Sequence, residues 1–201
     1  MKLKVKKKYI ILILSVILLL LVAFTLAYFT ASDFVTNRFS GKSHADEKNE
    51  VRITVKEEFD PPEEKNNEAF QKSVQIKNTG NADCFIRVRL EFSSSEIRDI
   101  TWLSNDENKD NNDAYVKASN YPYSVLPNGW EYRADGFYYY TEAVSSNDTT
   151  ESLIKWVKTV YPDDTLEDAD EYDIFVYSES VLAVGENGER LSYEDAWKEY
   201  V

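Results

Sequence analysis

The segment from Cys84 to Phe92 constrains the fold more than any other part of this chain. Its residues alternate between an apolar set and a mostly charged set: Cys84, Ile86, Val88, Leu90 and Phe92 against Phe85, Arg87, Arg89 and Glu91. A repeat of two over nine residues matches a half-buried β-strand, whereas a helix repeats every 3.6 residues. Cys84 belongs to the apolar set, so we expect a small buried side chain there rather than a reactive thiol.

Further strands are expected on both sides of this segment. Alternating or apolar runs bounded by turn residues predict strands at Val51–Val55, Phe70–Asn78, Leu153–Tyr161 and Tyr172–Val184. Trp130 to Val144 predicts a hairpin, since Asp-Gly between aromatic residues favours a tight turn. Residues 93–120 are polar and resemble loops, apart from Ile97 to Leu103. Several short strands separated by turns are typical of a β-sandwich or barrel.

Only the end of the chain has a helical pattern. Ser192 is suited to cap a helix, and Asp195 lies three residues later, as in a capping box. We expect this helix to pack on the β-domain. The sequence therefore predicts an all-β domain over residues 51–201, preceded by an N-terminal segment and linker at residues 28–50.

The first 27 residues are a candidate export signal. Five lysines precede an uncharged run from Tyr9 to Ala27, which ends in small residues. Two outcomes are open. Either the leader is cleaved between Ala27 and Tyr28, or it stays as an anchor, because its nineteen uncharged residues span about 28 Å as a helix. Both outcomes place residues 28–201 outside the cytoplasm, with membrane contact only through residues 9–27.

Charge and residue content narrow the classes of function. The chain has 23 basic and 36 acidic residues, a net charge of −13, and the basic residues include the leader lysines. With this net charge, the chain lacks the basic surface that nucleic-acid-binding proteins use. His44 is the only histidine and lies in the linker. A Ser-His-Asp or Cys-His arrangement on the β-domain is therefore excluded. We expect no catalytic residue and no cofactor.

Two acidic stretches are candidates for calcium. Asp106, Asn108 and Asp110 place oxygen atoms at alternate positions, as the start of an EF-hand loop does. Asn111 replaces the turn glycine and Lys117 replaces the closing glutamate, so we expect no site tighter than about millimolar. The second stretch is expected to be a solvated loop; its carboxylates are Asp163, Asp164, Glu167, Asp168, Asp170 and Glu171.

The aromatic run from Phe137 to Tyr140 lies on an expected strand. Neighbouring side chains of a strand face opposite sides, so at least one pair of rings points away from the core, and Phe85 joins that pair if its own strand is half exposed. Two outcomes are open. This outer face is an exposed partner surface, or sheet-on-sheet packing buries both faces of the strand.

The end of the leader resembles the export signals that a SipW-type signal peptidase processes in the TasA/camelysin family of Gram-positive bacteria. The resemblance rests on Leu26–Asp33, which holds the short Ala-Tyr-Phe stretch, and on Asn37–Gly41. The body is similar too. Lys72–Leu90 gives an extended strand, an Asn-Thr-Gly turn and a second strand, and Tyr172–Val184 and Tyr193–Tyr200 also resemble that family.

The resemblance implies a jelly-roll-like antiparallel β-sandwich exported to the cell surface or extracellular matrix. The family includes the main protein of biofilm fibres, in which a mature N-terminal strand is thought to complete the sheet of the next subunit. In this chain the candidates for such a donor strand are Tyr28, Phe29, Phe34, Val35 and Phe39. The implied partners are a signal peptidase during export, then further copies of the chain or other matrix and surface proteins.

The sequence thus favours an exported, non-enzymatic structural protein. A surface-tethered binding module is the alternative. A metalloprotease, as camelysin-like relatives are described, is less favoured because a histidine ligand set is missing.

Overall fold

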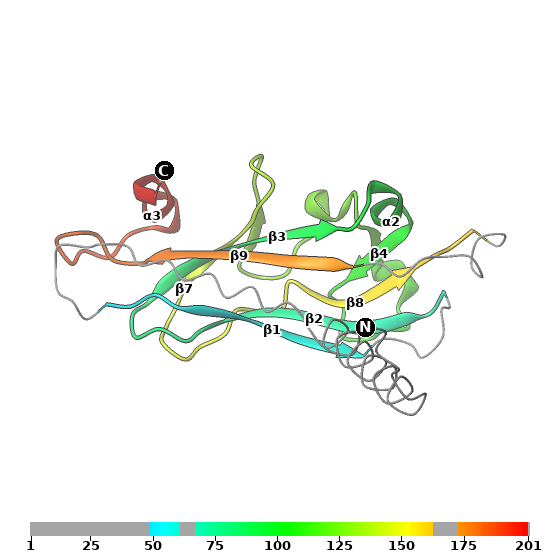
Figure 1. Ribbon diagram of the computed structural model, residues 1–201, viewed down its shortest axis with the longest axis horizontal. Coiled ribbons are helices and arrows are strands. Elements are labelled where there is room, and N and C mark those ends of the chain that lie inside the picture. Colours follow the sequence, from blue (N-terminus) through cyan, green and yellow to red (C-terminus); the bar gives the residue numbers. More distant parts are fainter. Residues whose placement is uncertain (1–48, 61–66, 163–172, 201) are drawn as a thin grey trace, which may run out of the picture. The chain divides into compact units, whose positions relative to one another are not determined.

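Nine antiparallel strands form the framework of the structure, a computed structural model that describes residues 49–60, 67–162 and 173–200 (Figure 1). They form two sheets. In the first sheet the strand order is β1 (Ile53–Asp60), β2 (Ala69–Asn78), β8 (Ile154–Thr159), β4 (Thr101–Ser104) and β5 (Val116–Lys117). In the second it is β6 (Trp130–Tyr132), β7 (Tyr138–Val144), β3 (Cys84–Phe92) and β9 (Ile174–Leu182).

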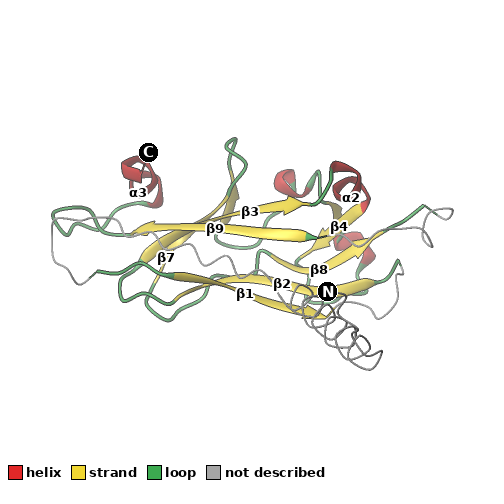
Figure 2. Ribbon diagram, viewed as in Figure 1, coloured by secondary structure: helices red, strands yellow, loops and turns green. Residues whose placement is uncertain are grey.

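Two α-helices and two short 3₁₀ turns complete the described elements (Figure 2). The helices are α2 (Ser95–Ile100) and α3 (Tyr193–Tyr200), and the 3₁₀ turns are η1 (Asn112–Ala114) and η2 (Tyr121–Tyr123). The prediction of an antiparallel β-sandwich with a C-terminal helix is confirmed. The predicted N-terminal apolar helix lies outside the described residues.

The core lies between the two sheets and is built by the inward residues of each strand. β2 and β8 contribute fully buried residues from the first sheet, among them Val74, Ile76 and Val157. β3 contributes Ile86 and Val88 from the second. Burial of each such side chain is worth about 1.5–3 kcal/mol, so this layer holds the sheets together.

β3, the strand that the alternation predicts, lies inside the second sheet, between β7 and β9. It pairs with β7 on one side and over its full length with β9 on the other, from Cys84 opposite Leu182 to Phe92 opposite Ile174. Cys84 is fully buried, which confirms the prediction of a small buried side chain.

Asn78 fixes the turn between β2 and β3. Its side chain is fully buried, and Nδ2 donates to the carbonyls of Ala82 and Val144 at 2.8 and 2.9 Å. Its Oδ1 accepts from the Gly80 amide at 2.9 Å. A buried amide is costly unless its hydrogen bonds are satisfied, and here both ends of the side chain have partners. Asn78 thereby links β7 to the β2–β3 turn, where the chain passes from the first sheet to the second.

The predicted hairpin is present as β6 and β7. Trp130 lies opposite Tyr140 and Tyr132 opposite Tyr138. Gly136 in the turn has a φ of +89°, a conformation that side chains other than glycine rarely adopt. Gly129, just before β6, has a φ of +81°, and a Cβ there would lie 2.6 Å from the Tyr140 ring.

α2, β4 and β5 lie within the stretch that the sequence indicated to be mostly loop, and the expectation of a single terminal helix is wrong. α2 has six residues, none of them buried, and begins where the Ser94 hydroxyl accepts from the Ile97 amide at 3.2 Å. β4 and β5 have four and two residues. Elements this short show no measurable period, so pattern reasoning does not detect them.

Candidate functional site

The outer face of the second sheet carries a cluster of arginine and aromatic side chains. Arg87 on β3 lies between two rings, with its guanidinium carbon 4.2 Å from the Phe137 centroid and 4.3 Å from that of Trp197. Its Nε donates to Glu179 at 2.7 Å and its Nη1 to the Tyr139 hydroxyl at 2.8 Å. Both side chains of the Arg87–Glu179 pair are nearly buried.

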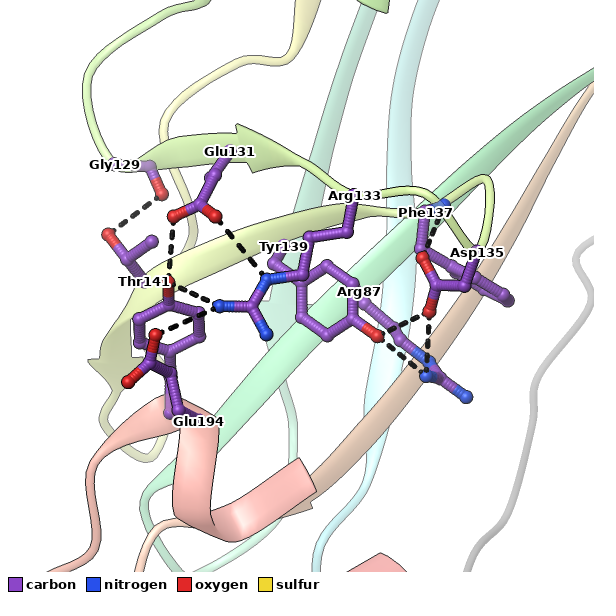
Figure 3. A network of polar contacts seen from close by, with 10 residues as sticks. Arg87, Gly129, Glu131, Arg133, Asp135, Phe137, Tyr139, Thr141 and Glu194 are labelled. Atoms are coloured by element: carbon purple, nitrogen blue, oxygen red, sulfur yellow. Dashed lines mark hydrogen bonds and ion pairs between the residues drawn. The ribbon is translucent and has the colours of Figure 1, made fainter. Parts of the chain in front are cut away.

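A second arginine repeats this arrangement on the hairpin (Figure 3). The Arg133 guanidinium lies 4.9 Å from the Tyr139 ring and 4.8 Å from the Tyr193 ring. Its Nη2 donates to the Tyr193 hydroxyl at 2.7 Å and to Glu194 at 3.2 Å. Figure 3 shows the Tyr139 ring between the two guanidinium groups.

These contacts hold α3 against the sheet. Trp197 packs edge-on against Tyr139 at 5.6 Å, and Phe85 contacts Tyr193 at 6.4 Å. Phe85, Phe137 and Tyr139 are buried with the helix residues. The chain's own C-terminal helix thus covers the outer aromatic face. The exposed partner surface is therefore wrong, and the cover on this face is α3 rather than a second sheet.

The helix itself begins as the capping box predicts. The Ser192 hydroxyl accepts from the Asp195 amide at 3.1 Å and donates to the Asp195 carboxylate at 2.8 Å. The hydrogen bond that the Ser192 hydroxyl donates to this carboxylate, together with the neighbouring Lys198 ammonium, lowers the pKa of Asp195. The Arg-aromatic cluster is a docking contact within the domain, because the Arg87 and Arg133 guanidinium groups contact side chains of both the sheet and α3.

An open pocket lies at the end of the sandwich where β3 stops. Its volume is about 240 Å³, and it receives residues from both sheets, including Leu90 of β3 and Leu103 of β4. Arg98 of α2, Tyr123 of η2 and Tyr132 of β6 also line it. Pockets that join apolar side chains to a few convergent polar groups are the usual sites of small-molecule binding.

The two sheets leave long strands at one pair of edges. β1 pairs only with β2 and β9 only with β3 among the described residues. The Arg52 carbonyl accepts from the Thr79 amide, so even-numbered residues of β1 bond to β2. The backbone groups of the odd-numbered residues, from Ile53 to Phe59, consequently point to the other side. Such a row of backbone groups is a template for another strand.

The calcium candidates form a turn of their own. The Asp106 carboxylate accepts from the Asn108 amide at 2.8 Å, and the Asn108 side-chain oxygen accepts from the Asp110 amide at 3.1 Å. The other Asp106 oxygen accepts from Asn111 at 3.1 Å. Across the described ranges, no three His, Cys, Asp or Glu side chains are placed to share a metal ion.

Several candidate residues lie outside the described residues. They are the cleavage pair Ala27 and Tyr28, the donor-strand candidates Phe29, Phe34, Val35 and Phe39, the linker His44, and the second acidic stretch from Asp163 to Glu171. The cleavage, donor-strand and acidic-loop predictions therefore stay predictions. In the part of the chain that the structure describes, no helix has the length and apolarity needed to cross a bilayer.

Cys84 gives a direct test of the core. Burial, and secondarily the charge of Asp83, raises the pKa of its thiol to about 12. Because the thiolate is the reactive form, we expect iodoacetamide at pH 8 to leave the native protein unmodified. In denaturant one thiol per chain should be alkylated, as mass spectrometry would show. Rapid alkylation of the native protein would place Cys84 at the surface.

Two features were not anticipated from the sequence. The pairing of Arg87 with Glu179 joins strands far apart in the chain, and the pocket collects residues from α2, η2 and the hairpin. The one local signal was the alternation in Cys84–Phe92, which places Arg87 and Arg89 on the face opposite the apolar set. The partners of these two arginines depend on which strands become neighbours.

The fold and these surfaces define a two-sheet β-sandwich domain with a helix on one outer face and long strands at one pair of sheet edges. Comparisons with family models, curated proteins and solved structures give no match to this chain.

Proposed function

We propose that this chain is an exported, non-enzymatic structural protein of the bacterial cell surface or extracellular matrix, whose subunits join by strand addition. The observation that carries the proposal is the β1 edge, where the backbone groups of the odd-numbered residues from Ile53 to Phe59 face away from β2. The leader and the resemblance to TasA-type export signals support the compartment.

The N-terminal segment supplies a donor of suitable chemistry. Tyr28, Phe29, Phe34, Val35 and Phe39 are apolar, whereas the eleven residues from Ser40 to Glu50 are mostly polar. Each exposed aromatic ring forgoes about 1.5–3 kcal/mol of burial, so the segment gains by pairing with a sheet edge. Eleven extended residues reach up to about 36 Å, far enough to meet a neighbouring subunit.

Addition to a neighbour is a head-to-tail contact. Main-chain hydrogen bonds supply affinity and alternate side chains supply register. A contact of this kind that does not close into a ring gives filaments. Folding back of the same segment onto its own sheet is the competing outcome, and a comparison of two chain lengths separates the two.

Protein that starts at Tyr28 is expected to form larger assemblies than protein that starts at Glu50, as light scattering and electron microscopy would show. Phe59→Pro in the longer protein is expected to reduce assembly. It removes an amide that points away from β2, and proline is tolerated where that amide faces outward. Phe59→Ala is the matched control, because it removes the same half-exposed ring and keeps the amide.

The proposal fails if both lengths are identical monomers at high concentration, with or without acid or metal. If the Phe59→Pro and Phe59→Ala proteins assemble equally, β1 is not the edge that accepts the added strand. A second candidate function, a surface binding module, is favoured by the pocket at the end of the sandwich.

A further inference from the structure

Three tyrosine rings form a stepped wall in the pocket at the end of the sandwich. Tyr138 packs against Tyr132 with ring centroids 5.0 Å apart, and Tyr132 meets Tyr123 edge-on at 5.8 Å. Burial falls from the inside outward, since Tyr138 is 4% exposed and Tyr123 is 81% exposed. Large aromatic side chains are usually buried, so an exposed ring at a pocket mouth offers contact area to a ligand.

The same pocket gathers polar groups that make no hydrogen bond to other described residues. Within the described part of the chain, no hydrogen bond is made by the hydroxyls of Tyr123, Tyr132, Tyr138 and Ser119, all of which belong to pocket residues. Among the residues that the structure describes, the Arg98 guanidinium pairs with its neighbour Asp99, through Nε and Nη2, which leaves Nη1 as a donor. Phenol and alcohol hydroxyls both donate and accept, so this set suits a ligand with many hydroxyl groups.

The electrostatics of the pocket favour an uncharged ligand. Burial raises the pKa of Tyr132 and of Tyr138, so both rings are neutral phenols at physiological pH. Arg98 is the one cationic side chain of the lining, and Asp99 already pairs with it. The chain as a whole carries a net charge of −13, which repels polyanions.

We propose that this pocket binds a single neutral saccharide ring, with the apolar face of the sugar on Tyr123 and its hydroxyls on Tyr132, Ser119 and Arg98. The volume of about 240 Å³ is below the ~300–1,000 Å³ of pockets for drug-sized ligands, which suits one ring. The pocket is open to solvent, so the remainder of a glycan chain extends outward. This site is independent of the strand edges used for assembly.

Calorimetric titration of the full chain tests the proposal. The protein is kept in a zwitterionic detergent, because a detergent with a sugar headgroup would compete. Maltotriose, cellotriose and triacetylchitotriose are the neutral probes, and trigalacturonate is the acidic one. We expect a neutral probe to bind with a Kd of about 1 mM or tighter, about −4 kcal/mol, and trigalacturonate to bind more weakly.

Three variants identify the site. Tyr123→Ala is expected to weaken binding about tenfold or more, because it removes the outer ring and its hydroxyl. Tyr132→Phe keeps the wall and removes one hydroxyl, so binding should weaken several-fold. Val125→Ala is the matched control. It lies on the same segment, is 94% exposed and is not part of the pocket lining, so binding should be unchanged.

Other outcomes overturn the proposal. They are no binding of any neutral probe at roughly 10 mM, tighter binding of trigalacturonate than of every neutral probe, and equal binding by wild type and both tyrosine variants. Circular dichroism melting confirms that each variant is folded. If Tyr123→Ala unfolds, Tyr132→Phe alone decides, since it alters one exchangeable hydroxyl.

Discussion

Val88→Asp is expected to abolish cooperative unfolding of the domain. Val88 is fully buried at the middle of β3, where Tyr138 and Ser178 lie opposite it on the two neighbouring strands. A carboxylate in this layer has no partner, and an unpaired buried charge costs several kcal/mol. Domains of this size have a total stability of about 5–15 kcal/mol. Thermal melting followed by circular dichroism should show a broad or absent transition.

Glu91→Gln is the matched control for this change. Glu91 lies on the same strand and is exposed, and its partner Arg89 is also substantially exposed. Exposed ion pairs contribute about 0–1 kcal/mol, so the control should melt within a few degrees of wild type. A melting temperature of Val88→Asp that is close to the control would mean that this side of β3 does not face the core.

Arg87→Met is expected to destabilise the domain by about 3–5 kcal/mol, because it leaves Glu179 nearly buried without its cationic partner. It also removes the guanidinium that lies between Phe137 and Trp197. Urea denaturation followed by tryptophan fluorescence measures the change. The double variant Arg87→Met with Glu179→Leu should regain much of the loss, because replacing both members of a buried pair with apolar residues is often neutral.

Arg89→Met provides the comparison on the same face. Arg89 lies two residues further along β3 and pairs with Glu91, and both side chains are 42% exposed or more. We expect a loss of about 1 kcal/mol or less. Equal losses for Arg87→Met and Arg89→Met would show that the Arg87–Glu179 pair is no more important than a surface pair. If the double variant does not regain stability, the stability lost in Arg87→Met comes from the ring contacts of Arg87 instead.

The two proposals make separate demands on the chain. Assembly depends on the N-terminal segment and the β1 edge, whereas saccharide binding depends on Tyr123, Tyr132 and Arg98 at the pocket. Phe59→Pro is expected to change assembly and leave saccharide binding unchanged, and Tyr123→Ala is expected to do the reverse. A matrix or surface protein with both properties would join subunits through its edges and hold glycan chains at the sandwich end.

Local pattern alone located the longer elements. The alternation in Cys84–Phe92 gave β3 with its bounds, because period-two burial appears directly in the residue types. The Asp-Gly turn located the β6–β7 hairpin, and Ser192 with Asp195 located α3. Each of these signals lies within a few residues of the structure that it specifies. α2, β4 and β5 were missed because they are too short to show a period.

The tertiary structure alone decided which surfaces are covered and which are open. The sequence indicated that one pair of the rings from Phe137 to Tyr140 faces away from the core, and the structure shows that this pair is Phe137 and Tyr139. Their burial depends on Trp197 and Tyr193, which a helix at the other end of the chain brings onto the sheet. The pocket likewise needs Arg98, Tyr123 and Tyr132 to meet. Residue type fixes the face on which a side chain lies, whereas its partners depend on long-range strand pairing, which local periodicity does not encode.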